Sequence, residues 1–217
     1  WNNFRSILYF LNQDKLDRPL SDSEFNQVKQ VISGLKSPYE AGQFLYGLNG
    51  VSQVEVDLDE GRHVFLTVFD QKQVGAGNTV YQVVNQIRRV PKITGRQERR
   101  FDTTLLINGL PVIQIEEKAD THDVNEALNQ MHQYIGERQY TDIFSTLQMA
   151  ITPNDVKYMA NTTADKFNKD FAFRWQSRDN KPVRNWKDFA DLMLRIPMAH
   201  QMATNFMILD GTKNKQM

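Results

Sequence analysis

The first fifty residues carry the hydrophobic spacing of helices. The apolar residues nearest the start recur three or four positions apart and therefore share one helical face: Phe4, Ile7, Leu8 and Leu11. A second helix is expected to begin at residues 21–24, where Ser21 and Glu24 have the spacing of a capping box. Its apolar stripe is Phe25, Val28, Val31, Ile32 and Leu35. A third, short helix is expected over residues 38–46, before the helix-breaking residues 47–50.

After Gly50 the hydrophobic period changes from that of a helix to that of a strand. Alternating apolar and polar positions predict strands over residues 62–69, 79–88, 101–107 and 111–117. Residues 71–78 are expected to form a loop. Asn108 and Gly109 separate the last two strands, and this dipeptide is the strongest short hairpin signal because both positions must tolerate a positive φ.

The second half of the chain returns to alternating helices and strands. We expect an amphipathic helix over residues 120–137, a strand over 142–151, strand-like pieces of undetermined order over 158–174, and a helix over 186–195. The chain ends in a polar run at residues 210–215. A hairpin followed by a helix and another strand predicts an α/β fold with a mixed central β-sheet flanked by helices.

Composition narrows the function classes. The 217 residues include 26 basic and 26 acidic side chains and no cysteine. Disulfide scaffolds, thiolate zinc sites and cysteine nucleophiles are therefore excluded, and a reducing cytoplasm is consistent with this usage. No apolar run approaches the roughly 18 residues of a membrane span. Because the chain begins at Trp1 without a signal peptide, we expect it to be a fragment of a longer polypeptide.

The predicted hairpin carries the candidate chemistry. Along its second strand, Glu116 and Lys118 share one face with Gln114, since strand side chains alternate. A two-residue turn pairs Ile107 with Leu110, so that Asp102 is expected to oppose Ile115, directly beside Glu116. Two carboxylates and one ammonium would then converge within a few ångströms.

Such a convergence suits metal-assisted phosphodiester hydrolysis. Asp102 and Glu116 offer the hard oxygen ligands that Mg²⁺ prefers, and Mg²⁺ keeps its remaining positions for water and phosphate oxygens. The ion lowers the pKa of a bound water, and Lys118 would orient that water or stabilise the transition state. The alternative is a surface strand with an ordinary Glu–Lys pair, because E-x-K triplets are common.

A basic cluster precedes Asp102 on the chain. It consists of Arg88, Arg89, Lys92, Arg96, Arg99 and Arg100, with Glu98 as the single acid among them. A zero net charge argues against a general polyanion binder, but this local cluster can attract a phosphate backbone without reading its sequence. Its position beside Asp102 favours contact with DNA over an ordinary solvated loop.

Three features resemble a known nuclease family. Asp102-x₁₃-Glu116-x-Lys118 resembles the PD-(D/E)xK motif, with Phe101 where many members have Pro, and Gln130-x-x-x-Tyr134 resembles the accessory QxxxY motif of RecB-like members. The run RRFDTTLLINGLPVIQIEEK is similar to the amino-terminal nuclease domain of the restriction (R) subunit of type I restriction–modification enzymes. Weaker likeness at residues 81–86, 144–150 and 194–200 extends the resemblance over about residues 60–200.

The resemblance implies a function and site roles. It implies a PD-(D/E)xK restriction-endonuclease-like core and a cytoplasmic type I site-specific deoxyribonuclease acting on double-stranded DNA, with no sequence recognition of its own. Asp102 and Glu116 would be Mg²⁺ ligands and Lys118 the catalytic lysine. Gln130 and Tyr134 would shape the site or contact DNA.

The resemblance also implies parts that lie outside these residues. It implies methyltransferase and specificity subunits as partners and a following ATP-driven motor, whose ATP site is absent from this sequence. The expected organisation is a helical segment over residues 1–50 that packs on the core, an endonuclease core over 51–200, and the start of the connection to the motor over 201–217.

Glu117 departs from the family pattern. Members usually have an apolar residue between the Glu and the Lys, and an unpaired carboxylate on the back face of a strand is costly to bury. The backbone carbonyl of Glu117 can still be a metal ligand. The departure keeps open a second interpretation, a catalytically inactive nuclease-fold module that binds DNA or docks the motor.

Overall fold

The computed structural model describes residues 1–75, 77–140 and 146–217. Its longer helices are α1 (Asn2–Leu11), α2 (Asp22–Ser33), α3 (Pro38–Tyr46), α4 (Val124–Gly136), α5 (Trp186–Met193) and α6 (Met198–Ala203). Three short 3₁₀ turns lie at Gln71–Gln73, Ala164–Lys166 and Lys169–Phe171. The start of the strand predicted over 142–151, Phe144 of the family-like flank, and Ala76 of the predicted loop lie outside the described residues.

The strands form one five-stranded sheet and two hairpins. The large sheet contains β3 (Tyr81–Arg89), β4 (Arg99–Ile107), β5 (Leu110–Glu117), β6 (Leu147–Thr152) and β7 (Asp155–Ala160), in that spatial order. Only the β5–β6 pair is parallel, so the sheet is mixed, as the sequence predicted. The hairpins are β1 (Val51–Asp57) with β2 (His63–Asp70), and β8 (Leu209–Asp210) with β9 (Lys215–Gln216).

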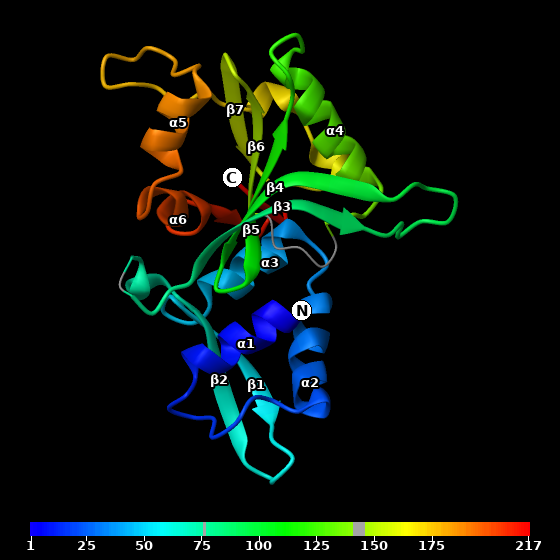
Figure 1. Ribbon diagram of the computed structural model, residues 1–217, viewed down its shortest axis with the longest axis vertical. Helices are drawn as coiled ribbons and strands as arrows, with labels where there is room; N and C mark the ends of the chain where they lie inside the picture. The colour runs from blue at the N-terminus through cyan, green and yellow to red at the C-terminus, as the bar shows by residue number, and fades with distance from the viewer. Residues whose placement is uncertain (76, 141–145) are drawn as a thin grey trace.

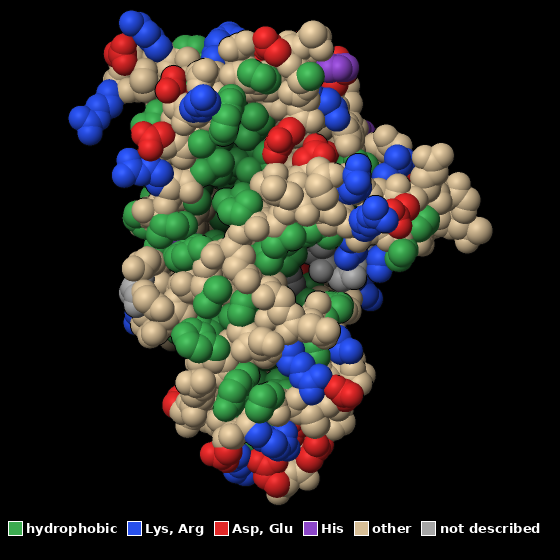
Figure 2. Space-filling view, viewed as in Figure 1, with side chains coloured by type: hydrophobic (Ala, Val, Ile, Leu, Met, Phe, Trp, Pro, Cys, Tyr) green, Lys and Arg blue, Asp and Glu red, His purple; other side chains and the backbone are tan. Residues whose placement is uncertain are grey.

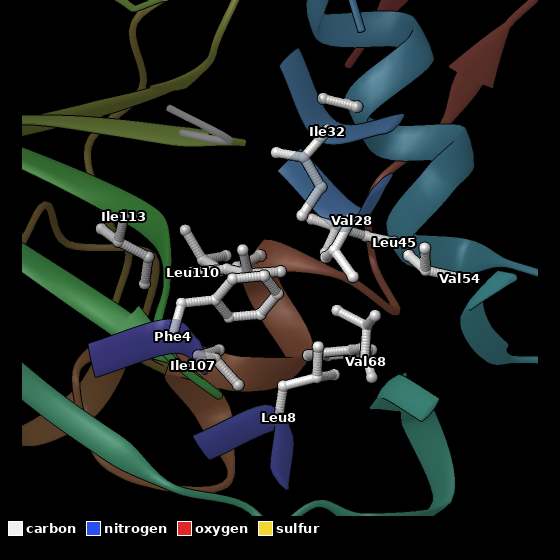
Figure 3. Close-up of a cluster of buried hydrophobic side chains, with 14 of the residues drawn as sticks. Phe4, Leu8, Val28, Ile32, Leu45, Val54, Val68, Ile107, Leu110 and Ile113 are labelled. Atoms are coloured by element: carbon white, nitrogen blue, oxygen red, sulfur yellow. The ribbon is translucent and has the colours of Figure 1, made fainter. Parts of the chain in front are cut away.

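Helix α4 packs against β5, β6 and β7, and α5 contacts β7. The amino-terminal helices and the β1–β2 hairpin lie below the sheet in Figure 1, next to the turn end of β5. Leu110 and Ile113 of β5 meet Phe4 and Leu8 of α1 and Val68 of β2 in a buried cluster (Figure 3). Burying these side chains contributes about 1.5–3 kcal/mol each. The sheet and the amino-terminal helices therefore share one hydrophobic core.

Local signals explain the helix boundaries. Ser21 and Glu24 form the predicted capping box of α2, and Ser37 caps α3 with Pro38 in its first turn. Helix α4 begins four residues later than predicted. Asp123 is its N-cap and accepts a hydrogen bond from the Asn125 amide (2.7 Å), while the Glu126 side chain completes a second capping box.

The β4–β5 hairpin turns where the sequence predicted, but its register differs. Asn108 and Gly109 have φ values of 52° and 78°. A bulge between Leu105 and Leu106 shifts the pairing, so that Thr103 lies opposite Ile115. The prediction that Asp102 opposes Ile115 was wrong, because a bulge leaves one residue of β5 unpaired and shifts every later partner by one.

The carboxy-terminal polar run also has structure. Residues 209–216 form the β8–β9 hairpin beside α3, and Gln216 is buried. Its side-chain amide donates to the carbonyl oxygens of Thr146 (3.2 Å) and Asn161 (3.3 Å). Within the described residues, no helix combines the length and the apolar character that crossing a membrane requires.

Candidate active site

Asp102 and Glu116 come together where strands β4 and β5 separate. The last paired residues there are Thr103 and Ile115. Beyond them, Asp102 Oδ2 accepts a hydrogen bond from the backbone amide of Glu117 (2.9 Å). This bond ties the Asp102 carboxylate to the end of β5, next to Glu116. The bulge thus brings the two carboxylates closer in register than the sequence predicted.

Glu116 is a fully buried carboxyl group among polar neighbours. Gln114 Nε2 donates to Glu116 Oε1 (3.2 Å) and Gln130 Nε2 donates to Glu116 Oε2 (3.1 Å). Burial, followed by the charge of Asp102, raises the pKa of Glu116 to about 9. Despite the nearby Lys118 ammonium, which lowers this pKa, a pKa of about 9 keeps the carboxyl group protonated at neutral pH when no metal ion is bound.

Gln130 of α4 links the catalytic candidates to one another. Its Oε1 accepts a hydrogen bond from Lys118 Nζ, and its Nε2 donates to the Tyr134 hydroxyl as well as to Glu116. Gln130 and Tyr134 share one face of α4, as their i, i+4 spacing predicted. One side-chain amide therefore contacts a carboxyl group, an ammonium and a phenol.

Tyr134 is held by aromatic contacts from two directions. Its ring lies 5.3 Å from that of Phe101 and 6.4 Å from that of Tyr140, which itself lies 5.2 Å from Phe101. Burial and the nearby charge of Glu116 raise the pKa of Tyr134. The hydroxyl group consequently stays protonated as a hydrogen-bonding group of the site. Phe101, which stands where many family members have Pro, packs behind the accessory residues.

Glu117 points to the opposite side of β5 and is exposed. Its Oε1 accepts a hydrogen bond from the Thr103 hydroxyl (2.7 Å). The acid that departs from the family pattern is therefore solvated on the back of the sheet, so the expected burial penalty does not arise.

The two carboxylates form a pair and not a larger acidic cluster. Among residues 1–75, 77–140 and 146–217, no three His, Cys, Asp or Glu side chains gather in an arrangement that could hold a metal ion.

The basic cluster lies on the β3–β4 hairpin, which extends from the body of the molecule (Figure 1). Lys and Arg side chains gather over this hairpin in Figure 2. Arg88 and Arg100 are exposed cross-strand neighbours, and Lys92 and Arg96 lie in the exposed connection. Arg89 donates to the Gln139 carbonyl oxygen (3.1 Å). Arg99 instead faces α4 and forms an ion pair with Glu137.

Three contributors to the site were not identified from the sequence. Gln114 donates a hydrogen bond to Glu116. Gln86 donates a hydrogen bond to Asp102, with a donor–acceptor distance of 3.5 Å. Glu137 is the C-cap residue of α4 and forms an ion pair with Arg99. Gln114 already shares a strand face with Glu116 in the sequence pattern. Gln86 lies in the family-like segment 81–86 on β3, the strand before Asp102, but it was assigned no role. Glu137 carries no such signal, because its contact joins β4 to the end of α4.

The mixed sheet, with two carboxylates and a lysine at the end of its central hairpin, is an α/β nuclease-like fold. Residues 1–169 match the family described as type I restriction enzyme R protein N terminus. The chain belongs to this family.

Individual relatives agree with the family match. The chain is 32% identical over 216 residues to the type I restriction enzyme SsaAORF53P endonuclease subunit of Staphylococcus saprophyticus, which covers 98% of this chain and 22% of that protein. It is also 32% identical over 160 residues to the type I restriction enzyme EcoprrI endonuclease subunit of Escherichia coli, covering 71% of this chain and 49% of that protein. The chain thus spans about a fifth of the length of its staphylococcal relative.

Proposed function

We propose that this chain is the endonuclease region of a longer restriction subunit and hydrolyses phosphodiester bonds of double-stranded DNA. The observation that carries the proposal is the bridging amide of Gln130. It holds Glu116 and Lys118 together beside Asp102, which is itself tied to β5. A carboxylate pair and an ammonium joined in this way are a hydrolytic set rather than scattered surface charges.

The donor set fits Mg²⁺. Asp102 and Glu116 supply the one or two carboxylates that Mg²⁺ usually takes from a protein, and the main-chain carbonyl of Glu117 is a further oxygen donor. A bound Mg²⁺ would supply an acidified water and would stabilise negative charge on the phosphate. Ligation requires the ionised form of Glu116, so this side chain must release the proton that burial favours.

Lys118 contributes through its charge and its position. Its ammonium donates to Gln130 Oε1, which leaves two further N–H groups for a phosphate oxygen or the attacking water. A fixed ammonium next to the scissile phosphate stabilises the charge that develops in the transition state. Gln130 keeps that ammonium on the Glu116 side of the site.

DNA would reach the site along the basic hairpin. The charges on β3, β4 and their connection lead toward Asp102 and can hold a phosphate backbone without reading bases. In the complete enzyme we propose that recognition belongs to specificity and methyltransferase subunits in the cytoplasm, and that an ATP-driven motor on the remainder of the subunit delivers DNA to this domain.

The test is plasmid cleavage by the full-length subunit with its partners, ATP and Mg²⁺. Lys118→Ala should abolish strand scission while ATP hydrolysis continues, because the ammonium acts on the phosphate and not on the motor. Lys15→Ala is the matched control. Lys15 is also half-buried and donates to a carbonyl oxygen, that of Phe65 (2.9 Å), but it lies in the amino-terminal part of the fold.

The outcomes separate the two interpretations of the fold. Loss of cleavage in Lys118→Ala alone, with ATP turnover retained, assigns the chemistry to this hairpin. Equal cleavage by wild type, Lys118→Ala and Lys15→Ala would refute the proposal and favour a non-catalytic module that binds DNA or docks the motor.

A further inference from the structure

Arg99 and Glu137 form a two-pronged ion pair between β4 and the end of α4. Arg99 Nε donates to Glu137 Oε2 (2.7 Å) and Arg99 Nη2 donates to Glu137 Oε1 (2.6 Å). The Glu137 side chain is only 4% exposed and that of Arg99 is 21% exposed. Gln133 Nε2 adds a third hydrogen bond to Glu137 Oε1 (3.0 Å). Paired guanidinium and carboxylate groups with this geometry hold each other in a fixed orientation.

The pair joins the two elements that carry the site. Arg99 precedes Asp102 by three residues on β4, and Glu137 follows Tyr134 by three residues at the end of α4. The guanidinium of Arg99 also lies over the Tyr134 ring, 5.7 Å from its centre. A cation above an aromatic face is attracted to it. Arg99 therefore holds both the end of α4 and the ring that α4 presents to the sheet.

Tyr134 connects the Arg99–Glu137 pair to Glu116 and Lys118 through Gln130. Its hydroxyl accepts a hydrogen bond from Gln130 Nε2, and the same amide contacts Glu116 and Lys118. A side-chain amide can rotate or flip unless its partners define its orientation. The position of the Tyr134 hydroxyl thus selects the rotamer in which Gln130 faces both Glu116 and Lys118.

Arg99 differs in this respect from the other basic residues of the hairpin. Arg88 and Arg100 are exposed on their strands, whereas the charge of Arg99 is matched by a buried carboxylate on α4. Its hydrogen bond holds the pKa of Glu137 below the usual range, so the pair remains charged around neutral pH. The guanidinium is already engaged and is poorly placed to bind a phosphate.

We propose that Arg99 and Glu137 are a positioning pair that holds Tyr134, and through it Gln130, in line with Glu116 and Lys118. The inference rests on the proposed nuclease function. It replaces the sequence-based role of Arg99 as a DNA contact and adds Glu137 to the residues on which cleavage depends.

The experiment compares single-turnover DNA cleavage by full-length wild type, Glu137→Gln and Arg99→Lys under saturating DNA and Mg²⁺. Each variant should cleave about tenfold more slowly. This is the usual effect of removing a hydrogen-bond partner that orients a residue in direct contact with the metal or substrate. DNA affinity should be unchanged. Glu24→Gln is the matched control. Glu24 is a buried carboxylate that binds Arg18 through two hydrogen bonds (2.8 Å each) in the amino-terminal part of the fold, and its loss should leave cleavage unchanged.

A double variant distinguishes positioning from general stability. If the pair acts through the Tyr134 hydroxyl, Glu137→Gln should cause no further loss of rate in a Tyr134→Phe background. In the 217-residue chain without metal, Glu137→Gln should shift the NMR signal of the Gln130 side-chain amide, and Glu24→Gln should not.

The results also separate this inference from the proposed function. If Lys118→Ala abolishes cleavage but Glu137→Gln cleaves like wild type, or if the Glu137 and Tyr134 effects multiply independently, the positioning role is wrong and the nuclease proposal stands. If Arg99→Lys and Glu137→Gln lose DNA affinity with an unshifted Gln130 signal, Arg99 is a DNA contact after all. If Lys118→Ala cleaves normally, both proposals fail.

Discussion

Burial and a second carboxylate act on the same side chain at Glu116. Both effects disfavour the ionised form, and together they raise the pKa of this group to about 9 from its ordinary value of 4.5. Gln114 and Gln130 satisfy both oxygens, so the group is compatible with a protein interior.

This shift predicts a pH-dependent stability for the metal-free chain. Below about pH 4.5 Glu116 is protonated in both the folded and the unfolded state. Between about pH 4.5 and 9 only the unfolded state ionises, so the free energy of unfolding falls as pH rises through this window. Glu116→Gln, which remains neutral, should lose this dependence.

The measurement is the melting temperature at pH 5, 7 and 9 in the presence of a chelator. Relative to Glu116→Gln, wild type should become progressively less stable toward pH 9. Parallel profiles for the two proteins would contradict the raised pKa.

At the scale of elements, the β4–β5 hairpin decides where the site forms. Its turn needs a left-handed conformation at Asn108 and Gly109. The Asn108 side chain also ties the turn to its surroundings, accepting from the Val80 amide (2.9 Å) and donating to the Val68 carbonyl oxygen (3.1 Å). The bulge beyond Leu105 then aligns Asp102 with the end of β5.

Gly109→Ala should destabilise this hairpin. An added Cβ would lie 3.0 Å from Phe4 Cα and 3.2 Å from Ile7 Cδ1, on a backbone with φ of 78°. The strained conformation alone costs about 1–3 kcal/mol. We expect the free energy of unfolding, measured with denaturant, to fall by more than that amount, because the close contacts with Phe4 and Ile7 add to the backbone strain. Gly61→Ala is the comparison, because Gly61 also has a positive φ (88°) but no atom lies near the added Cβ. Equal losses would show that packing against α1 contributes nothing.

At the scale of the whole molecule, charge is distributed unevenly. The 26 basic and 26 acidic residues cancel, yet Lys and Arg side chains gather on the β3–β4 hairpin (Figure 2). Under the proposed function, this local positive charge would attract the phosphate backbone of DNA although the net charge of the chain is zero. Arg99 lies on β4 and is paired with Glu137 at the end of α4, so the exposed arginines of this hairpin are Arg88, Arg96 and Arg100.

Reversing the charge of these three arginines should weaken DNA binding and flatten its salt dependence. Each lost phosphate contact reduces the slope of log affinity against log salt by about 0.9. The control reverses Arg178, Arg184 and Arg195, which changes the net charge equally at exposed positions near α5. The measurement is DNA affinity over a salt series. An unchanged slope in the hairpin variant, or an equal change in the control, would remove this hairpin from the DNA interface.

Local sequence determined much of this architecture. Capping boxes at Ser21 and Asp123, the spacing of apolar residues and the Asn108–Gly109 turn define α2, α4 and the central hairpin through contacts between residues near in the chain. Strand β1 was missed although its pattern alternates. The alternation of Glu116 and Lys118 left an ordinary surface pair open. The candidate site was proposed from the resemblance of Asp102, Glu116 and Lys118 to a nuclease motif.

The tertiary structure decided what depends on contacts between distant segments. The bulge that sets the true partner of Ile115, the burial that raises the pKa of Glu116, and the exposure of Glu117 all arise from how neighbouring strands and α4 pack. The ion pair of Arg99 with Glu137 likewise joins residues 38 positions apart. By itself the sequence placed Arg99 in a basic cluster. The packing of α4 on the sheet places the buried carboxylate of Glu137 beside Arg99, because residues that are remote along the chain become neighbours only in the fold.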